Sequence, residues 1–322
     1  MNILCYGAGS LGSLYAAQLQ EAGHEVTVLT RGRRLADLRE HGIRLEDGAT
    51  GRQSTTHVGV VETLEPSDAY DLVLVVMAKH HLTAVLPHLA SNRGTPNILF
   101  MCNNAAGPAV MVDALGPERV LLGFPGAAGY PTGDVIRYVI VSRREQPTTV
   151  GEVHHPRGIT PRLRRIRSTL EEAGFPAAIC PNMDAWLKTH AAEIVPTAGA
   201  LYREEDELSR LAASNHSIDL MIQAIRENYR VLLARRISIT PRNHSVFRWL
   251  PRALLRGIIR RQLQSELTEI KIGHVKSAAT EMKLLADELR GHAGDTRDTP
   301  AMDELYAHIV EAADLLSASS HG

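Results

Sequence analysis

Two segments far apart in the chain carry side chains suited to acid–base chemistry. Trp186-Leu187-Lys188 supplies an amine, and Leu267-Thr268-Glu269-Ile270 supplies a carboxylate. A lysine beside a reducible carbonyl polarises it and donates the proton that accompanies hydride transfer. A neighbouring carboxylate would hold that lysine or bind a substrate hydroxyl. A surface lysine and a glutamate in a helical salt bridge fit the same residues, so spacing alone leaves both interpretations open.

A glycine-rich segment at the start of the chain predicts a dinucleotide site. Glycines at its first, third and sixth positions permit a tight turn, a close backbone approach to pyrophosphate and close packing of helix on strand. The N-terminus of the following helix offers N–H donors to phosphate. The alternative is a glycine-rich turn in another α/β protein. The segment consists of Gly7, Ala8, Gly9, Ser10, Leu11 and Gly12.

The residues after the second predicted strand favour NADPH over NADH. An NAD site usually places Asp or Glu there, against the ribose hydroxyls. This chain has Thr30-Arg31-Gly32-Arg33-Arg34 instead. A guanidinium matches a 2′-phosphate through paired hydrogen bonds, and Arg31 is the first candidate. Arg33 and Arg34 also fit a solvated helix start.

The first half of the chain alternates short apolar runs with helical patterns, which predicts a parallel sheet covered on both faces. Residues 136–153 are less regular and fit antiparallel β-structure at a sheet edge. The predicted helices cover 11–22, 34–40 and 161–173. The predicted strands cover 2–6, 25–30, 71–77, 97–101, 120–123 and 177–180.

After Pro181 the pattern becomes helical, with long amphipathic stretches over 217–234 and 263–289. We therefore predict a Rossmann-type doubly wound α/β domain over residues 1–181 and an all-α domain over 182–322. The first would bind NADPH, and the second would serve substrate binding or dimerisation. Substrate is expected between them, at the carboxyl ends of the strands.

Over nearly its whole length the sequence resembles the ketopantoate reductase (2-dehydropantoate 2-reductase) family. The N-terminal GAGSLGSLYAAQLQEAGHEVTVLTR follows the family's opening, Arg31 included. DAWLK, ending at Lys188, resembles the family's Trp-x-Lys, and LTEI at 267–270 resembles its Thr-Glu-Ile. Cys-Asn-Asn at 102–104 occupies the place of its Asn-Gly turn.

The resemblance implies roles for single residues. Lys188 would be the proton donor of an NADPH-dependent reductase, Glu269 would position Lys188 or the substrate, and Asn103 would face both cofactor and substrate. The family also carries a lysine after the third strand, which should fall at Ala78. Lys79 is one residue away, so its part in cofactor binding stays open.

Departures from the family pattern affect the positions expected to hold the substrate. The family has asparagines four and eight residues after its lysine, a spacing that puts all three side chains on one helix face. This chain has Ala192 and Pro196 there, Gly257 in place of a serine, and Asn104 in place of the turn glycine. A proline is also expected to bend or break the helix just past Val195.

These losses make the expected pocket less polar, so we predict a small carbonyl or imine substrate other than ketopantoate. Two alternatives stay open: a genuine ketopantoate reductase that holds its substrate differently, and an NADPH-binding sensor without activity. His190 and Glu193 are further candidates for an altered pocket. The 15 histidines show no metal-ligand spacing, so no metal is expected. The arginines at 157–167 and 252–261 fit solvated helix faces.

Composition limits the partners. Lys plus Arg total 35 and Asp plus Glu 36, a balance that argues against a nucleic-acid binder. No apolar run of membrane-spanning length and no export signal is present, and three unpaired cysteines fit a reducing compartment. We expect a cytoplasmic enzyme with a small-molecule substrate, as a monomer or a homodimer.

Overall fold

The chain folds into two compact units. A computed structural model describes residues 1–153, 158–265, 268, 270, 278–294 and 298–319. The first unit comprises Met1–Asn103 and Pro108–Met183, and the second comprises Asn104–Gly107 and Asp184–Gly322. The first unit thus extends two residues beyond residue 181, and segment 104–107 joins the second unit, which the sequence did not indicate.

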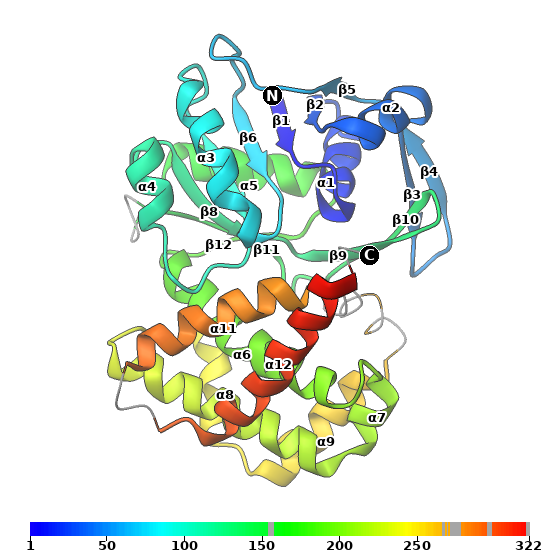
Figure 1. Ribbon diagram of the computed structural model, residues 1–322. Coiled ribbons are helices and arrows are strands. Elements are labelled where there is room, and N and C mark those ends of the chain that lie inside the picture. The colour runs from blue at the N-terminus through cyan, green and yellow to red at the C-terminus, as the bar shows by residue number, and fades with distance from the viewer. Residues whose placement is uncertain (154–157, 266–267, 269, 271–277, 295–297, 320–322) are drawn as a thin grey trace. The chain divides into compact units, whose positions relative to one another are not determined.

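The first unit is built on an eight-stranded sheet of order β12-β11-β8-β7-β6-β1-β2-β5 (Figure 1). The six strands from β8 to β5 are parallel, whereas β11 runs antiparallel to β8 and parallel to β12. The strands are β1 (Asn2–Tyr6), β2 (Glu25–Leu29), β5 (Gly59–Val61), β6 (Leu72–Val75), β7 (Ile98–Met101), β8 (Val120–Phe124), β11 (Thr148–Glu152) and β12 (Ala177–Ile179).

Helices cover both faces of this sheet, as the apolar runs predicted. From β1 the chain crosses to β2 through α1, and from β6 it crosses the other way to β7 through α3. Right-handed crossovers in opposite directions place these helices on opposite faces. Every residue of β6 and β7 is consequently buried. The helices are α1 (Ser10–Glu21), α2 (Gly32–His41), η1 (Lys79–His81), α3 (Leu82–Ser91), α4 (Ala109–Leu115) and α5 (Pro161–Glu172).

A second, four-stranded sheet was not predicted. Its order is β4-β3-β10-β9, with β3 (Ile43–Asp47), β4 (Gln53–Thr56), β9 (Ala127–Thr132) and β10 (Val135–Ile140). The prediction of edge structure over 136–153 was therefore only partly right. β11 is antiparallel as expected, but β12 lies outside it at the edge, and β10 belongs to the second sheet.

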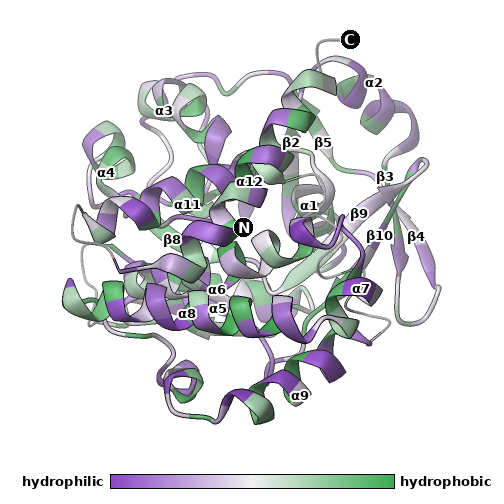
Figure 2. Cartoon of the chain, turned by 60° about the horizontal axis from the view of Figure 1, so that its bottom comes forward, coloured by the Kyte–Doolittle hydropathy of each residue, from purple (hydrophilic) through white to green (hydrophobic). Residues whose placement is uncertain are grey.

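The second unit is helical over the residues that the structure describes. Helix α8 packs against α9, α11 and α12. Alternating hydrophilic and hydrophobic residues are visible along α8 and α9 in Figure 2. None of the described helices is long and apolar enough to cross a membrane. The helices are α6 (Met183–Arg203), α7 (Leu208–Ala213), α8 (Asn215–Ala234), η2 (Arg242–Arg248), α9 (Arg252–Leu263), α11 (Ala279–Ala293) and α12 (Pro300–Ser319).

The amphipathic pattern over 263–289 does not form one helix. Helix α9 ends at Leu263, with Gln264 as its C-cap, and α11 begins at Ala279. Most residues between them lie outside the described part of the chain. The pattern therefore runs from the last residue of α9 into α11 across a segment that is not part of either helix.

Helix α6 runs through Pro196, contrary to the expected break. Proline has no N–H, so the carbonyl of Ala192 loses its usual helical partner. Asn228 of α8 replaces it, since its Nδ2 donates to the Ala192 oxygen at 3.1 Å. Asn228 is 4% exposed, and Ala192 is fully buried. A side chain from a neighbouring helix thus satisfies the carbonyl that the proline leaves without a partner, and the helix continues to Arg203.

The three cysteines form no disulfide, and all three are buried. Cys5 lies on β1, and burial raises the pKa of its thiol to about 12. Such a thiol stays protonated and unreactive at neutral pH.

Candidate functional site

Four of the predicted cofactor-binding features of the first unit follow parallel strands. The glycine-rich segment follows β1, Arg31 follows β2, Lys79 follows β6, and Asn103 follows β7. These strands are consecutive in the sheet, in the order β7-β6-β1-β2. The carboxyl ends of parallel strands share one edge, and the chain reverses its winding direction between β1 and β6. The structure thus brings these residues to the edge where open α/β sheets bind ligands.

The three glycines of the glycine-rich segment meet different steric demands. Gly7 has φ +115°, and a Cβ there would lie 2.5 Å from the Val76 oxygen. A Cβ on Gly12 would lie 2.0 Å from the Gly7 oxygen, which no side chain tolerates. Gly9 is different, because a Cβ there would meet no atom within 4 Å. The first and last glycines are thus required by the fold, and the middle one faces open space at the start of α1.

The start of α1 has the features of an anion site. Gly9 is its N-cap, no side chain caps the helix, and no acidic residue lies in its first turn. The first N–H groups of a helix have no intrahelical partners and carry partial positive charge. Ser10 and Leu11 belong to this turn, and Ala8 helps hold it, since the Ser13 hydroxyl donates to the Ala8 oxygen at 3.1 Å.

The arginines after β2 differ in their hydrogen-bond partners and exposure. Arg34 contacts Asp37 at 2.5 Å and donates to the Ser13 hydroxyl at 3.1 Å, so it braces the start of α1. Arg31 is exposed, and its Nε donates to the Glu62 oxygen at 3.3 Å. Burial raises the pKa of Tyr6 at the end of β1, and the charge of Arg31 opposes that rise. Arg31 therefore lies near the carboxyl end of β1 as well as that of β2.

Lys79 and Asn103 lie at the ends of the central strands. Lys79 opens the short helix η1 and is 9% exposed. Asn103 is half-buried, and its Oδ1 is a buried acceptor without a hydrogen-bond partner among the described residues. A buried polar atom of this kind calls for a ligand or water.

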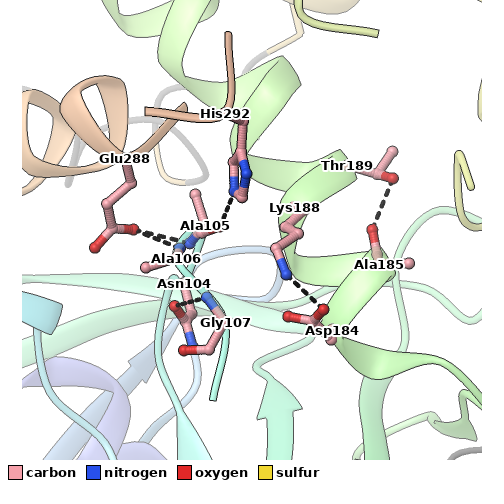
Figure 3. A network of polar contacts seen from close by, with 10 residues as sticks. All are labelled: Asn104, Ala105, Ala106, Gly107, Asp184, Ala185, Lys188, Thr189, Glu288 and His292. Carbon is pink, nitrogen blue, oxygen red and sulfur yellow. Dashed lines mark hydrogen bonds and ion pairs between the residues drawn. The ribbon is translucent and has the colours of Figure 1, made fainter. Parts of the chain in front are cut away.

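Lys188 of α6 is buried and forms an ion pair with Asp184, whose side chain is 37% exposed (Figure 3). The Lys188 side chain is 8% exposed, and its Nζ donates to Asp184 Oδ2 at 2.5 Å. The backbone of Gly107 lies beside the pair, since a Cβ there would be 3.2 Å from Lys188 Nζ and 3.3 Å from Asp184 Oδ1. The second carboxylate oxygen of Asp184 is buried and without a hydrogen-bond partner among the described residues. This arrangement holds an ammonium with an acceptor beside it.

The sequence interpretation did not single out Asp184. It sought the carboxylate in Glu269, which lies outside the described residues. The spacing of Asp184 and Lys188, four residues apart on a predicted helix, is the signal that could have found the pair.

Three of the positions that depart from the family pattern, 192, 196 and 257, carry no polar side chain. Ala192 is part of the helical core, Pro196 is buried, and Gly257 is exposed on α9. His190 stacks on Trp186, with ring centroids 5.4 Å apart. Ala192, Pro196 and Gly257 therefore supply no polar group in place of the side chains expected from the resemblance.

Glu193 belongs to a separate cluster. Its Oε1 accepts hydrogen bonds from the Tyr229 hydroxyl and, at 2.6 Å, from His244 Nδ1. Burial lowers the pKa of His244, but the hydrogen bond and charge of Glu193 outweigh it, and the net direction is a rise above 6.5.

The His244–Glu193 pair should make stability depend on pH. A histidine with a raised pKa in the folded state stabilises fully below its unfolded pKa, near 6.5, and loses that effect as pH rises through the folded value. Wild type should therefore lose stability relative to His244→Gln between about pH 6 and pH 8. The difference should stay below about 1 kcal/mol, because the imidazole is partly exposed. Urea unfolding at both pH values measures it, and equal pH dependence in the two proteins would contradict the assignment.

No group of three or more His, Cys, Asp or Glu side chains is arranged to hold a metal ion in the described part of the chain.

The sequence of the first half of the chain is similar to a known family. Residues 3–153 match the family "Ketopantoate reductase PanE/ApbA". The match covers a little under half of the chain. A 2-dehydropantoate 2-reductase of Mesorhizobium japonicum is 27% identical over 218 residues. The aligned part covers 58% of this chain and 63% of that relative, so the match spans less than two thirds of its length.

The fold extends the likeness over the whole chain. A PanE/ApbA family ketopantoate reductase from Ralstonia eutropha JMP134 has a TM-score of 0.72 at 16% identity, covering 98% of this chain and 99% of that one. D-mandelate dehydrogenase in a ternary structure with NADH and anilino(oxo)acetate has a TM-score of 0.76 at 15% identity, with coverage of 98% and 99%. The ketopantoate reductase fold thus spans both units, including the part outside residues 3–153.

Proposed function

We propose that the protein is an NADPH-dependent reductase of a small 2-oxo acid or related carbonyl or imine compound, with Lys188 as the general acid. The observation that carries the proposal is the Lys188 ammonium, buried in an ion pair with Asp184 and confined by Gly107. A positioned acid at a carbonyl oxygen typically accelerates reduction by about 10²–10⁴.

The first unit fits a dinucleotide. The uncapped start of α1 would hold phosphate, and the open space at Gly9 would admit it to the backbone. Asn103 has an unsatisfied buried oxygen that suits a carboxamide or a sugar hydroxyl. Arg31 would bind the 2′-phosphate, and Lys79 is a further candidate for phosphate. The bound cofactor supplies the hydride.

The chain's own residues handle the proton. Lys188 donates from Nζ to the substrate oxygen as negative charge develops there. Asp184 holds the ammonium in place before the transfer and stabilises its charge. Glu269 remains the proposed second carboxylate, toward the substrate or Lys188.

Loss of polar groups at Ala192 and Pro196 favours a substrate less polar than ketopantoate. A site built for hydrogen bonds loses about 1–3 kcal/mol for each buried polar group left unmatched. The anilino(oxo)acetate bound by D-mandelate dehydrogenase carries an aromatic substituent on an oxo acid. An oxo acid with an apolar substituent is therefore the preferred substrate class.

The deciding experiment follows NADPH consumption with ketopantoate, aryl and alkyl 2-oxo acids, simple ketones and cyclic imines. Turnover of apolar oxo acids well above ketopantoate supports the proposal. Efficient turnover of ketopantoate would make the protein a genuine ketopantoate reductase. NADPH binding without turnover on any compound would favour a sensor, the alternative of another class.

The preference for NADPH should depend on Arg31. Replacing it by aspartate removes the 2′-phosphate ligand and places a carboxylate where NADH ribose hydroxyls would bind. We expect Arg31→Asp to weaken NADPH binding by about 10- to 100-fold, the value of one or two charge-assisted hydrogen bonds. Fluorescence titration with both cofactors measures it, and Arg33→Asp is the control on an adjacent exposed arginine. Unchanged affinities in Arg31→Asp would refute the assignment.

A further inference from the structure

The segment Asn104–Gly107 is closed by one of its own side chains. Asn104 Oδ1 accepts from the Gly107 N–H at 3.0 Å, and its Nδ2 donates to the Gly107 carbonyl at 2.9 Å. The Asn104 carboxamide thus forms hydrogen bonds with both the backbone N–H and the backbone carbonyl of Gly107, in the way that residues of neighbouring antiparallel strands pair. Asn104 is only 1% exposed. Such a buried, satisfied pairing fixes the shape of the segment.

Helix α11 holds this segment from two sides (Figure 3). Glu288 Oε2 accepts from the N–H groups of Ala105 and Ala106, at 3.0 and 2.9 Å. His292 Nε2 lies 2.8 Å from the Ala105 carbonyl, and because a carbonyl only accepts, this nitrogen carries the proton. Glu288 and His292 are four residues apart, so both project from one face of α11.

The two N–H groups point to one acceptor, a pattern that commonly binds anions. Here the Glu288 carboxylate fills that role from within the chain. The pair of N–H groups therefore anchors the segment to α11 instead of receiving an anionic substrate.

Gly107, the last residue of the segment, lies beside Lys188. Gly107 has φ +99°, a conformation that favours glycine, and its backbone faces both Lys188 Nζ and Asp184 Oδ1. Any shift of the segment would change the space around the ammonium. Glu288 and His292 on α11 thus hold the segment whose last residue lies beside Lys188.

We infer that Glu288 and His292 are positioning residues, which hold segment 104–107 so that Gly107 confines the Lys188 ammonium against Asp184. Their effect on turnover rests on the proposed function of Lys188. Their effect on the surroundings of Lys188 does not, and it can be measured without a substrate.

The test is competitive acetylation of the native protein with trace acetic anhydride, read at each lysine by mass spectrometry. The chain has five lysines, and the exposed Lys283 serves as the internal reference. Glu288→Ala removes two hydrogen bonds to a charged acceptor and should raise acetylation of Lys188 relative to Lys283 by about tenfold. With an active substrate, the same variant should lower kcat more than it raises KM.

Three variants complete the test. Glu288→Gln keeps a carbonyl oxygen for both N–H groups and should stay near wild type. His292→Ala removes the second anchor and should raise acetylation of Lys188 in the same direction, which serves as the test if Glu288→Ala does not fold. Glu311→Ala, at an exposed site on α12, should change nothing.

If Glu288→Ala and His292→Ala fold and Lys188 is acetylated in them to the same extent as in the wild-type protein, the inference is overturned. Equal effects of Glu288→Ala and Glu288→Gln would also overturn it, because the lost charge and not the lost acceptor would then matter. If Lys188→Ala keeps full turnover, the proposed function fails, while the acetylation result still decides the positioning role.

Discussion

Replacing Lys188 by alanine should lower kcat for carbonyl reduction by about two to four orders of magnitude. The variant loses the proton donor and leaves Asp184 without its cation. NADPH affinity should stay within about threefold of wild type, because the proposed cofactor residues lie at the strand ends of the first unit. Steady-state kinetics on the best substrate, together with NADPH titration, separates the two effects.

The chain offers a matched control for this substitution. Lys283 forms the same kind of pair with Asp287, four residues away on one helix at 2.8 Å, but its side chain is 37% exposed. Lys283→Ala should leave kcat unchanged. Asp184→Asn should lower kcat less than Lys188→Ala, because the lysine remains. Full activity of Lys188→Ala would exclude it as the general acid.

The variants Gly9→Ala and Gly12→Ala should differ in their effects on stability and on NADPH binding. A Cβ on Gly12 collides with the Gly7 oxygen at 2.0 Å, so α1 must move away from the loop. We expect Gly12→Ala to destabilise the protein by about 1–3 kcal/mol, as overpacking does, and to abolish NADPH binding. Thermal unfolding and cofactor titration measure the two losses.

Gly9→Ala is the matched variant. Gly9 has φ −67°, which alanine adopts freely, and no protein atom lies within 4 Å of the added carbon. Its thermal stability should therefore equal that of wild type. NADPH binding should still weaken at least about tenfold, or about 1.4 kcal/mol, because the methyl group fills the space proposed for phosphate. Normal affinity in Gly9→Ala would move the phosphate site elsewhere.

The sequence predicted the parallel sheet because its strands are buried on both faces and are therefore uniformly apolar, as Leu72–Val75 and Ile98–Met101 show. It did not predict β3 and β4, whose residues are mostly polar and mixed with loop residues, as in Gln53–Thr56. Such short strands form through pairing with distant partners. β3, for example, pairs with β10, about ninety residues later in the chain.

The candidate site was predictable where one local motif defines it. The glycine-rich segment and Arg31 follow from the strand–turn–helix pattern. The surroundings of Lys188 were not predictable in the same way, because Ala105 and Glu288 meet across 183 positions in the chain. The break expected at Pro196 was wrong for a related reason. The side chain that replaces the missing N–H comes from another helix, and no local pattern indicates it.

The Pro196–Asn228 arrangement also constrains how this protein can change by mutation. Restoring an N–H at position 196 alone would give the Ala192 oxygen a second donor, which its two lone pairs can accept, whereas removing Asn228 alone would leave that buried oxygen without one. The order of the two steps therefore matters, and the N–H at position 196 must come first. Efforts to place on this helix the asparagines that the family resemblance leads one to expect should begin at position 196 and change Asn228 only afterwards.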